Sequence, residues 1–220
     1  MENTRNYKQQ QIRRKPEKRT VSHNIILFKP FGVLCQFTDF SGKPTLASLG
    51  IFPHDIYPAG RLDFDSEGLV FLTNDGVLQH LLLEPKFNHP RTYLVQVERI
   101  PDESKLDQLR EGVVIEGKKT LPAEVQLLPE EPILPPRSVP IRFRKNVPTA
   151  WLKIILREGR NRQVRKMTAA IGYPTLRLVR TAIANVTIDG LEPGQHREVT
   201  GEELTALKEI LRQGNTSRRN

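Results

Sequence analysis

The sequence predicts an α+β fold in which strands and helices follow one another along the chain. Several short segments are continuously apolar or alternate between apolar and polar residues, which is the pattern of buried and half-buried strands. Between them lie segments with apolar residues at intervals of three and four, which is the pattern of amphipathic helices. A chain of 220 residues with 37% hydrophobic residues is sufficient for one domain, or for two small subdomains that share a core.

The predicted elements follow one another between residues 24 and 212. Strands are predicted at residues 25–28, 69–73, 91–97, 113–115, 121–128 and 150–156, and a strand pair bent near Ala184 at residues 175–188. Helices are predicted at residues 45–49, 76–83, 102–111, 162–171 and 202–211. The segments 113–115 and 121–128 are expected to pair with each other. Asn161 is expected to cap the helix that follows it, because asparagine is a favoured N-cap residue.

Both ends of the chain are predicted to lie outside this folded domain. Residues 1–23 carry seven Lys or Arg side chains against two glutamates, a net charge of +5, and almost no apolar residues. Such a segment cannot bury enough surface to offset the entropy of ordering, so we expect a disordered basic arm. It either contacts phosphates as a mobile cation or serves as a solubilising tail. Residues 213–220 are expected to form a frayed tail.

The amino-acid composition indicates which kind of partner the protein binds and in which cellular compartment it is found. The net charge of +9 and the pI of about 9.8 favour a polyanionic partner. Cys35 is the single cysteine, which excludes an intrachain disulfide and suits a reducing cytosol, so we expect a cytoplasmic protein. No apolar run reaches the length of a membrane span, and the five histidines lack metal-ligand spacing. We therefore expect neither a membrane partner nor a metal site.

The stretch 58–76 combines an acidic loop with the start of a core strand. Asp63, Asp65 and Glu67 are spaced two residues apart, just before the apolar run 69–73. A loop held by a rigid strand is a favoured place for chemistry. A solvated acidic turn explains the same spacing, and so does a hydrolase that uses two of these carboxylates. Spacing alone therefore does not select a catalytic group.

Several motifs stand in order along the chain, and together they cover most of the predicted domain. They are Lys29-Pro30 with Gly32, Gly60-Arg61-Leu62-Asp63, Asp65-Ser66-Glu67-Gly68-Leu69, Leu72-Thr73-Asn74-Asp75-Gly76, Arg91-Thr92-Tyr93, Glu158-Gly159-Arg160, Gln163-Val164-Arg165 with Met167, and Leu178 with Arg180. This series resembles the motifs of the RsuA-type RNA pseudouridine synthases, with the acidic loop in the place of their active-site signature. Arg91 stands where that family usually has lysine, a change that keeps the positive charge.

The resemblance implies both a fold and a reaction. The fold would be that of a pseudouridine synthase, a mixed, mainly antiparallel central sheet flanked by helices. The active-site cleft would lie between two subdomains, approximately residues 24–90 and 91–212, without a preceding S4 domain. The reaction would isomerise uridine to pseudouridine in RNA. Because this is a rearrangement within one nucleotide, we expect no cofactor and no metal.

The resemblance also implies roles for individual side chains. Asp63 would be the catalytic carboxylate, Arg165 would form an ion pair with it, and Tyr93 would stack against the target base. A further set of basic side chains is expected to contact RNA: Arg61, Arg142, Arg144, Lys145, Arg160, Arg162 and Lys166.

Three features resemble the subgroup that modifies 23S ribosomal RNA: the basic arm, the expected lack of an S4 domain, and the sequence Thr149-Ala150-Trp151-Leu152. We therefore expect 23S ribosomal RNA as the partner. Two alternatives stay open, namely the same reaction on 16S ribosomal RNA or another RNA, and a non-catalytic assembly factor that binds ribosomal RNA. We expect a monomer, because the chain has no heptad repeat and no spare apolar helix face.

Overall fold

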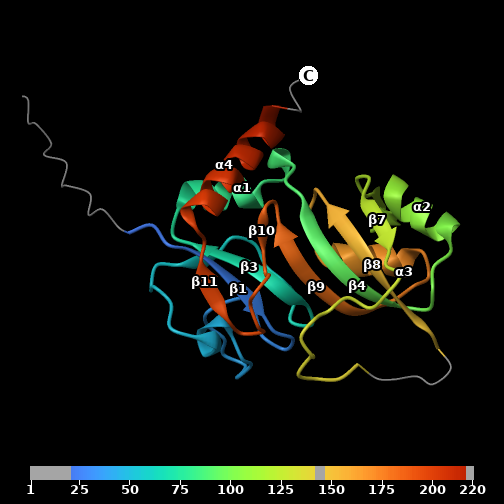
Figure 1. Ribbon diagram of the computed structural model, residues 1–220, viewed down its shortest axis with the longest axis horizontal. Coiled ribbons are helices and arrows are strands. Elements are labelled where there is room, and N and C mark those ends of the chain that lie inside the picture. Colours follow the sequence, from blue (N-terminus) through green and yellow to red (C-terminus); the bar gives the residue numbers. More distant parts are fainter. Residues whose placement is uncertain (1–20, 142–146, 217–220) are drawn as a thin grey trace, which may run out of the picture.

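The computed structural model describes residues 21–141 and 147–216, and in this part of the chain nine strands form one sheet (Figure 1). The strands are β1 (Asn24–Lys29), β2 (Tyr57–Pro58), β3 (Glu67–Thr73), β4 (Arg91–Glu98), β7 (Glu124–Leu127), β8 (Thr149–Leu156), β9 (Thr175–Ile183), β10 (Val186–Thr187) and β11 (His196–Glu198). The order across the sheet is β11-β1-β3-β9-β4-β8-β7, with β2 paired to β3 and β10 to β9. Among the named strands every pair is antiparallel except β3 and β9, so the predicted mixed, mainly antiparallel sheet is confirmed.

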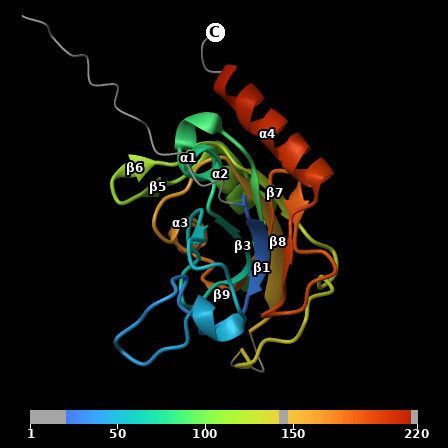
Figure 2. The same cartoon turned by 90° about the vertical axis from the view of Figure 1, so that its left-hand side faces the viewer.

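Helices cover both faces of this sheet. They are α1 (Gly76–Leu83), α2 (Glu103–Glu111), α3 (Gln163–Ala170) and α4 (Gly201–Thr216), with short 3-10 helices η1 (Leu46–Leu49) and η2 (Pro85–Phe87). Buried leucines of α1 and α4 pack on one face, whereas α2, α3 and the segment that contains η1 pack on the other. Figure 2 shows α4 on one side of the sheet and α3 on the other. In the described residues no helix is long and apolar enough to cross a membrane.

Most predicted elements appear at their expected places, but one strand pairing, one helix cap and one helix end differ from the prediction. Segment 113–115 does not pair with 121–128, because Glu116 and Gly117 both have positive φ and turn β5 (Val114–Ile115) onto β6 (Lys118–Lys119). The later segment joins the main sheet instead, as β7 beside β8.

The last two helices also differ from the prediction. Asn161 does not cap α3, since the helix begins at Gln163 and the residue before it, Arg162, is left-handed with a φ of 52°. The final helix continues to Thr216, beyond its predicted end at residue 211.

The C-terminal segment returns to the first half of the molecule. Strand β11 pairs with β1, and Leu207 and Leu211 of α4 pack with Ile26, Leu69 and other residues of the first half. The core is therefore not divided at residue 90, although two separate clusters do occupy one face of the sheet. One contains Val95, α2 and α3, and the other contains Val70 and η1. The space between these clusters is where a site can form.

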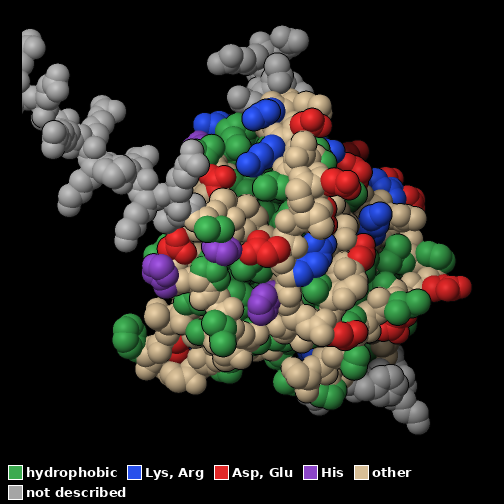
Figure 3. Space-filling view, turned by 60° about the vertical axis from the view of Figure 1, so that its left-hand side comes forward, with side chains coloured by type: hydrophobic (Ala, Val, Ile, Leu, Met, Phe, Trp, Pro, Cys, Tyr) green, Lys and Arg blue, Asp and Glu red, His purple; other side chains and the backbone are tan. Residues whose placement is uncertain are grey.

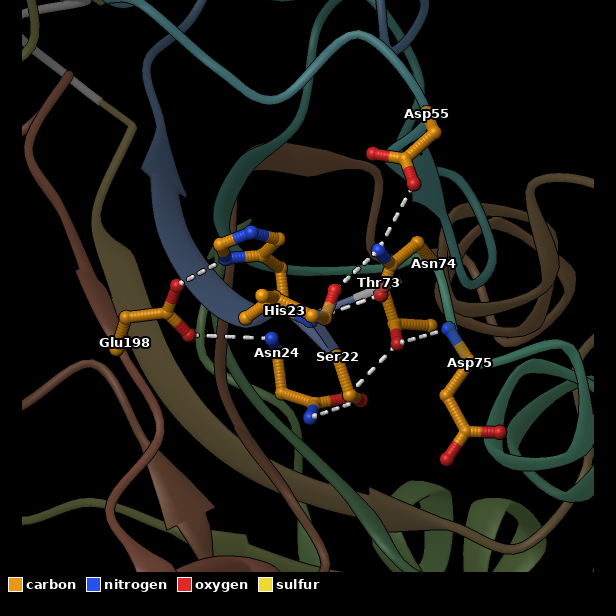
Figure 4. Close-up of polar contacts among 9 residues, drawn as sticks. Ser22, His23, Asn24, Asp55, Thr73, Asn74, Asp75 and Glu198 are labelled. Atoms are coloured by element: carbon orange, nitrogen blue, oxygen red, sulfur yellow. Dashed lines mark hydrogen bonds and ion pairs between the residues drawn. The ribbon is translucent and has the colours of Figure 1, made fainter. Parts of the chain in front are cut away.

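The described chain begins with a segment that is tied to the domain by side-chain hydrogen bonds (Figure 4). The amide of Asn74 donates to the carbonyl oxygen of Val21 and accepts from the backbone N–H of His23. Glu198 accepts from the backbone N–H of Asn24. Residues 21–23, which were predicted to belong to the disordered arm, are therefore held to the folded domain.

The surface beside this segment carries no single sign of charge. Figure 3 shows that acidic, basic and histidine side chains are interspersed over the visible described part of this side of the molecule. This side therefore lacks the continuous basic surface that a phosphate backbone would favour.

Candidate active site

A cleft of about 560 Å³ opens on the face of the sheet between the two clusters. Its walls come from the loop before β3, from β4 and β9, and from the turn that leads into α3. The lining includes the charged side chains of Arg61, Asp63, Arg160, Arg162 and Arg180 and the aromatic ring of Tyr93. Segments that are about 100 residues apart in the sequence thus meet in one cavity.

The acidic loop is held where β3 approaches β9. Gly68 has a φ of 105°, and a Cβ atom at this position would lie 2.2 Å from the carbonyl oxygen of Arg180. Only glycine allows this backbone approach, because any side chain would collide with β9. Next to it, Glu67 accepts two hydrogen bonds from Arg177, of 2.9 and 3.0 Å, with both side chains buried. The end of the loop is therefore fixed on a rigid part of the sheet.

Asp63 lies in the cleft with Arg162 beside it. Nη1 of Arg162 is 3.3 Å from Oδ2 of Asp63, and the Asp63 side chain is 30% exposed. The same guanidinium donates two hydrogen bonds of 2.8 Å to Asp65. These bonds hold the pKa of the Asp65 carboxyl below its ordinary value. The guanidinium of Arg162 thus binds the carboxylates of Asp63 and Asp65.

The predicted ion pair between Arg165 and Asp63 is wrong in this structure. Arg165 donates a hydrogen bond of 2.6 Å to the backbone oxygen of Asp65, and its Nε lies 3.5 Å from the carboxylate of that residue. Arg162 precedes the helix and lines the cleft, whereas Arg165 lies within α3 and does not. Arg165 therefore fixes the backbone of the acidic loop, and Arg162 supplies the charge next to Asp63.

Tyr93 lines the cleft from strand β4. Its side chain is on the same face of β4 as Val95 and is only 8% exposed. Across the sheet it is paired with Ile154 of β8 and Arg180 of β9. An aromatic side chain in this position can stack on a base that enters the cleft.

The predicted RNA-contacting side chains differ in how freely they can meet phosphate. Arg160 donates to the backbone oxygens of Lys118 and Lys119, and Lys166 pairs with Glu116 at 2.7 Å. These two residues connect the β5–β6 hairpin to the α3 region. Arg162 is occupied by the acidic loop, as described above. Arg142, Arg144 and Lys145 lie outside the described residues.

Arg61 is the free member of this set within the described part of the chain. It is exposed at the cleft and makes no hydrogen bond or ion pair there, since Asp65 and Glu67 are taken by Arg162 and Arg177. Its guanidinium is thus available to an RNA phosphate.

Two basic residues of the motif series, Lys29 and Arg180, are buried, and no role was predicted for either. Lys29 is fully buried, donates to the carbonyl oxygens of Pro30 and Val33, and has its pKa lowered to about 8 by burial. Arg180 is 4% exposed and lines the cleft. A charged residue inside an otherwise apolar strand was the signal that could have identified both, since such residues are seldom buried without a reason.

A carboxylate, an arginine and a tyrosine thus meet in one cleft on a mixed, mainly antiparallel sheet. Residues 23–170 match the family model described as RNA pseudouridylate synthase, and the chain belongs to this family. The predicted enzyme class, an isomerase that makes pseudouridine in RNA, is confirmed by this membership.

Two relatives and one solved structure support the assignment. The chain is 50% identical to ribosomal large subunit pseudouridine synthase E of Vibrio parahaemolyticus, over 84% of this chain and 77% of that protein. It is 54% identical to the protein of the same name from Xanthomonas axonopodis pv. citri, over 77% of this chain and 90% of that protein. A crystal structure of a pseudouridylate synthase superposes with a TM-score of 0.71 at 30% identity, covering 84% of this chain and 74% of the other.

Proposed function

We propose that this protein converts a uridine of 23S ribosomal RNA to pseudouridine, with Asp63 as the catalytic carboxylate. The observation that carries the proposal is the meeting of Asp63 and Tyr93 in one cleft, although Asp63 lies in the loop before β3 and Tyr93 lies in β4. The large-subunit names of the two relatives support ribosomal RNA as the substrate. The net charge of +9 suits a polyanion of this kind.

The reaction breaks the bond between N1 of uracil and C1′ of ribose and forms a bond between C5 and C1′. The hydrogen on C5 is lost and N1 gains one, so the substrate and the product contain the same atoms. Asp63 acts on the ribose or the base as an ionised carboxylate. Nη1 of Arg162, 3.3 Å away, forms an ion pair with this carboxylate.

The target uridine must leave its stack before it can enter the cleft. Unstacking costs a few kcal/mol. Stacking on Tyr93 returns roughly 1–3 kcal/mol of that cost. The exposed guanidinium of Arg61, two residues from Asp63, binds a phosphate near the entrance. Binding energy from the flanking RNA thus holds the base next to the carboxylate.

Asp63→Asn tests the catalytic assignment. We expect pseudouridine formation to fall by about 10⁴-fold or more while RNA affinity changes little, since the amide keeps the shape but not the charge. The measurement is carbodiimide treatment and primer extension on 23S ribosomal RNA incubated with each variant.

Asp65→Asn is the matched control, since Asp65 is in the same loop and binds the same arginine. We expect it to retain the chemistry at a reduced rate. Full activity of Asp63→Asn would contradict the proposal, as would loss of all activity in the control alone. Mapping the pseudouridines of ribosomal RNA from a strain in which the gene is deleted distinguishes a 23S from a 16S substrate. If that strain keeps every pseudouridine, the result supports a non-catalytic assembly factor instead.

A further inference from the structure

Strand β9 carries two buried arginines with opposite surroundings. Arg177 and Arg180 are 7% and 4% exposed. Because side chains alternate along a strand, residues three apart point to opposite faces of the sheet. Arg177 is on the face covered by α1 and α4, with Glu67, and Arg180 is on the cleft face, with Tyr93.

Arg177 is paired with a buried carboxylate of the protein. Its guanidinium binds both carboxylate oxygens of Glu67 and donates a further hydrogen bond of 2.8 Å to the carbonyl oxygen of Pro135. This is the usual condition of a buried charge, which is paired and hydrogen-bonded.

Arg180 has no such partner. Its Nε donates to the carbonyl oxygen of Leu69 at 2.8 Å, but its Nη2 is buried and, among the described residues, has no hydrogen-bond partner. Within the described chain no carboxylate lies at ion-pair distance from its guanidinium. Burying a guanidinium without a carboxylate partner lowers the stability of the folded protein. An arginine at this position therefore indicates a role in binding.

The other groups around Arg180 cannot neutralise it. Asp63 is paired with Arg162 at 3.3 Å. Arg91 also lines the cleft and is itself a cation, bound to the carbonyl oxygen of Leu82. His89 is buried, and burial together with the charges of Arg91 and Arg180 lowers its pKa to about 3, so its ring is neutral. The floor of the cleft is therefore positively charged when no RNA is bound.

We propose that Arg180 binds an oxygen of the target nucleotide and is the cation that the bound uridine satisfies. This inference rests on the proposed function. The acceptor is either a phosphate oxygen or a carbonyl oxygen of uracil, both of which form strong hydrogen bonds with guanidinium. If the electron pair of the breaking N1–C1′ bond passes to the base, the uracil oxygens gain negative charge. A cation already in place then stabilises that charge more than it stabilises the substrate.

Arg180→Met separates this role from a structural one, with Arg177→Met as the matched control on the same strand. We expect Arg180→Met to keep or raise the melting temperature, because it removes an unpaired buried charge, while kcat/KM falls about 10- to 100-fold. We expect Arg177→Met to lower the melting temperature by several degrees, because it leaves Glu67 buried without a partner. The inference is overturned if Arg180→Met is stable and has wild-type kcat/KM. It is also overturned if Arg180→Met is only partly folded but its folded fraction has wild-type kcat/KM.

Arg180→Lys keeps the test valid if the methionine variant does not fold. Lysine retains the positive charge but lacks the several N–H donors of the planar guanidinium. We therefore expect a kcat/KM between those of wild type and Arg180→Met. Wild-type kcat/KM in this folded variant would count against the guanidinium as the binding group.

Modified RNA fragments identify the acceptor. A neutral methylphosphonate next to the target uridine should weaken wild type but not Arg180→Met if a phosphate oxygen is bound. If a carbonyl oxygen is bound, sulfur in place of O2 or O4 of the target uracil should weaken RNA binding by wild type but not by Arg180→Met. If the two proteins respond alike to every modification, the inference is overturned. A wild-type protein that forms no pseudouridine in 23S ribosomal RNA overturns the proposed function instead, and binding of the fragments still tests Arg180.

Discussion

Gly68 shows how a single residue places the acidic loop. Its φ is 105°, and a Cβ atom there would lie 2.2 Å from the carbonyl oxygen of Arg180, which leaves no room for a side chain. The same close approach sets the parallel register between β3 and β9, in which Gly68 is opposite Arg180. Asp63 and the arginines of β9 therefore depend on this one residue for their relative position.

Gly68→Ala should destabilise the fold by about 2–4 kcal/mol, through strain at positive φ and through overpacking against β9. Gly42→Ala is the control, because Gly42 also has positive φ, 77°, but has open space around it. We expect the control to lose only about 1 kcal/mol, which measures the backbone strain alone. Thermal and urea unfolding give both values, and equal losses would show that the close approach to β9 contributes nothing.

The start of α4 is stabilised by reciprocal hydrogen bonds. The backbone N–H of Thr200 donates to Glu203 at 2.9 Å, and the backbone N–H of Glu203 donates to the hydroxyl of Thr200 at 3.2 Å. Arg197 adds two hydrogen bonds to the same carboxylate, of 2.7 and 2.8 Å. This capping box links β11, the loop and the helix.

The capping box makes α4 sensitive to acid. The hydrogen bonds from Arg197 lower the pKa of Glu203 from 4.5 to about 2. A lowered pKa means that the carboxylate stabilises the folded state above pH 4.5, and that this contribution is lost as the pH falls toward 2. Glu203→Gln should therefore cost about 0.5–1 kcal/mol at pH 7 and much less near pH 2.

Chemical denaturation of both proteins at a series of pH values measures this difference. Glu209→Gln serves as the control, since Glu209 is exposed on the same helix. A constant difference between Glu203→Gln and wild type from pH 7 to pH 2 would rule out the charge of Glu203 as the cause.

At the scale of the whole molecule, the positive charge near the N-terminus and the anchored segment lie in separate stretches of the sequence. The anchor joins Val21, His23 and Asn24 to Asn74 and Glu198 (Figure 4). Residues 1–20, which hold the seven basic side chains of the arm, precede this anchor. A deletion that ends at residue 20 therefore removes the charge and leaves the anchor intact.

Deletion of residues 1–20 should weaken binding to 23S ribosomal RNA and reduce the slope of log Kd against log salt by roughly 0.7–0.9 for each phosphate that the arm neutralises. A full-length variant with the seven basic residues of the arm changed to Gln controls for chain length. Binding curves at several salt concentrations provide the slope. An unchanged slope in both variants would show that the arm is a solubilising tail.

Local patterns were sufficient for most of the fold. Alternation along residues 91–97 identified β4, and the apolar run at 69–73 identified β3. The pairing of β5 was predicted wrongly, because two positive-φ residues formed a tight turn at Glu116 and Gly117 that has no strong sequence signal. Motif resemblance nominated Asp63, and the structure places it in the cleft.

The sequence by itself determined the fold class, the family and the loop that carries Asp63, since these depend on local periodicity and on motifs that are contiguous in the chain. The tertiary structure decided that Arg162 and not Arg165 lies next to Asp63, and that Arg177 is paired while Arg180 is not. The physical reason is distance. Electrostatic interactions between side chains about 100 residues apart depend on the register of β3 against β9 and on where α3 begins, and no local pattern encodes either.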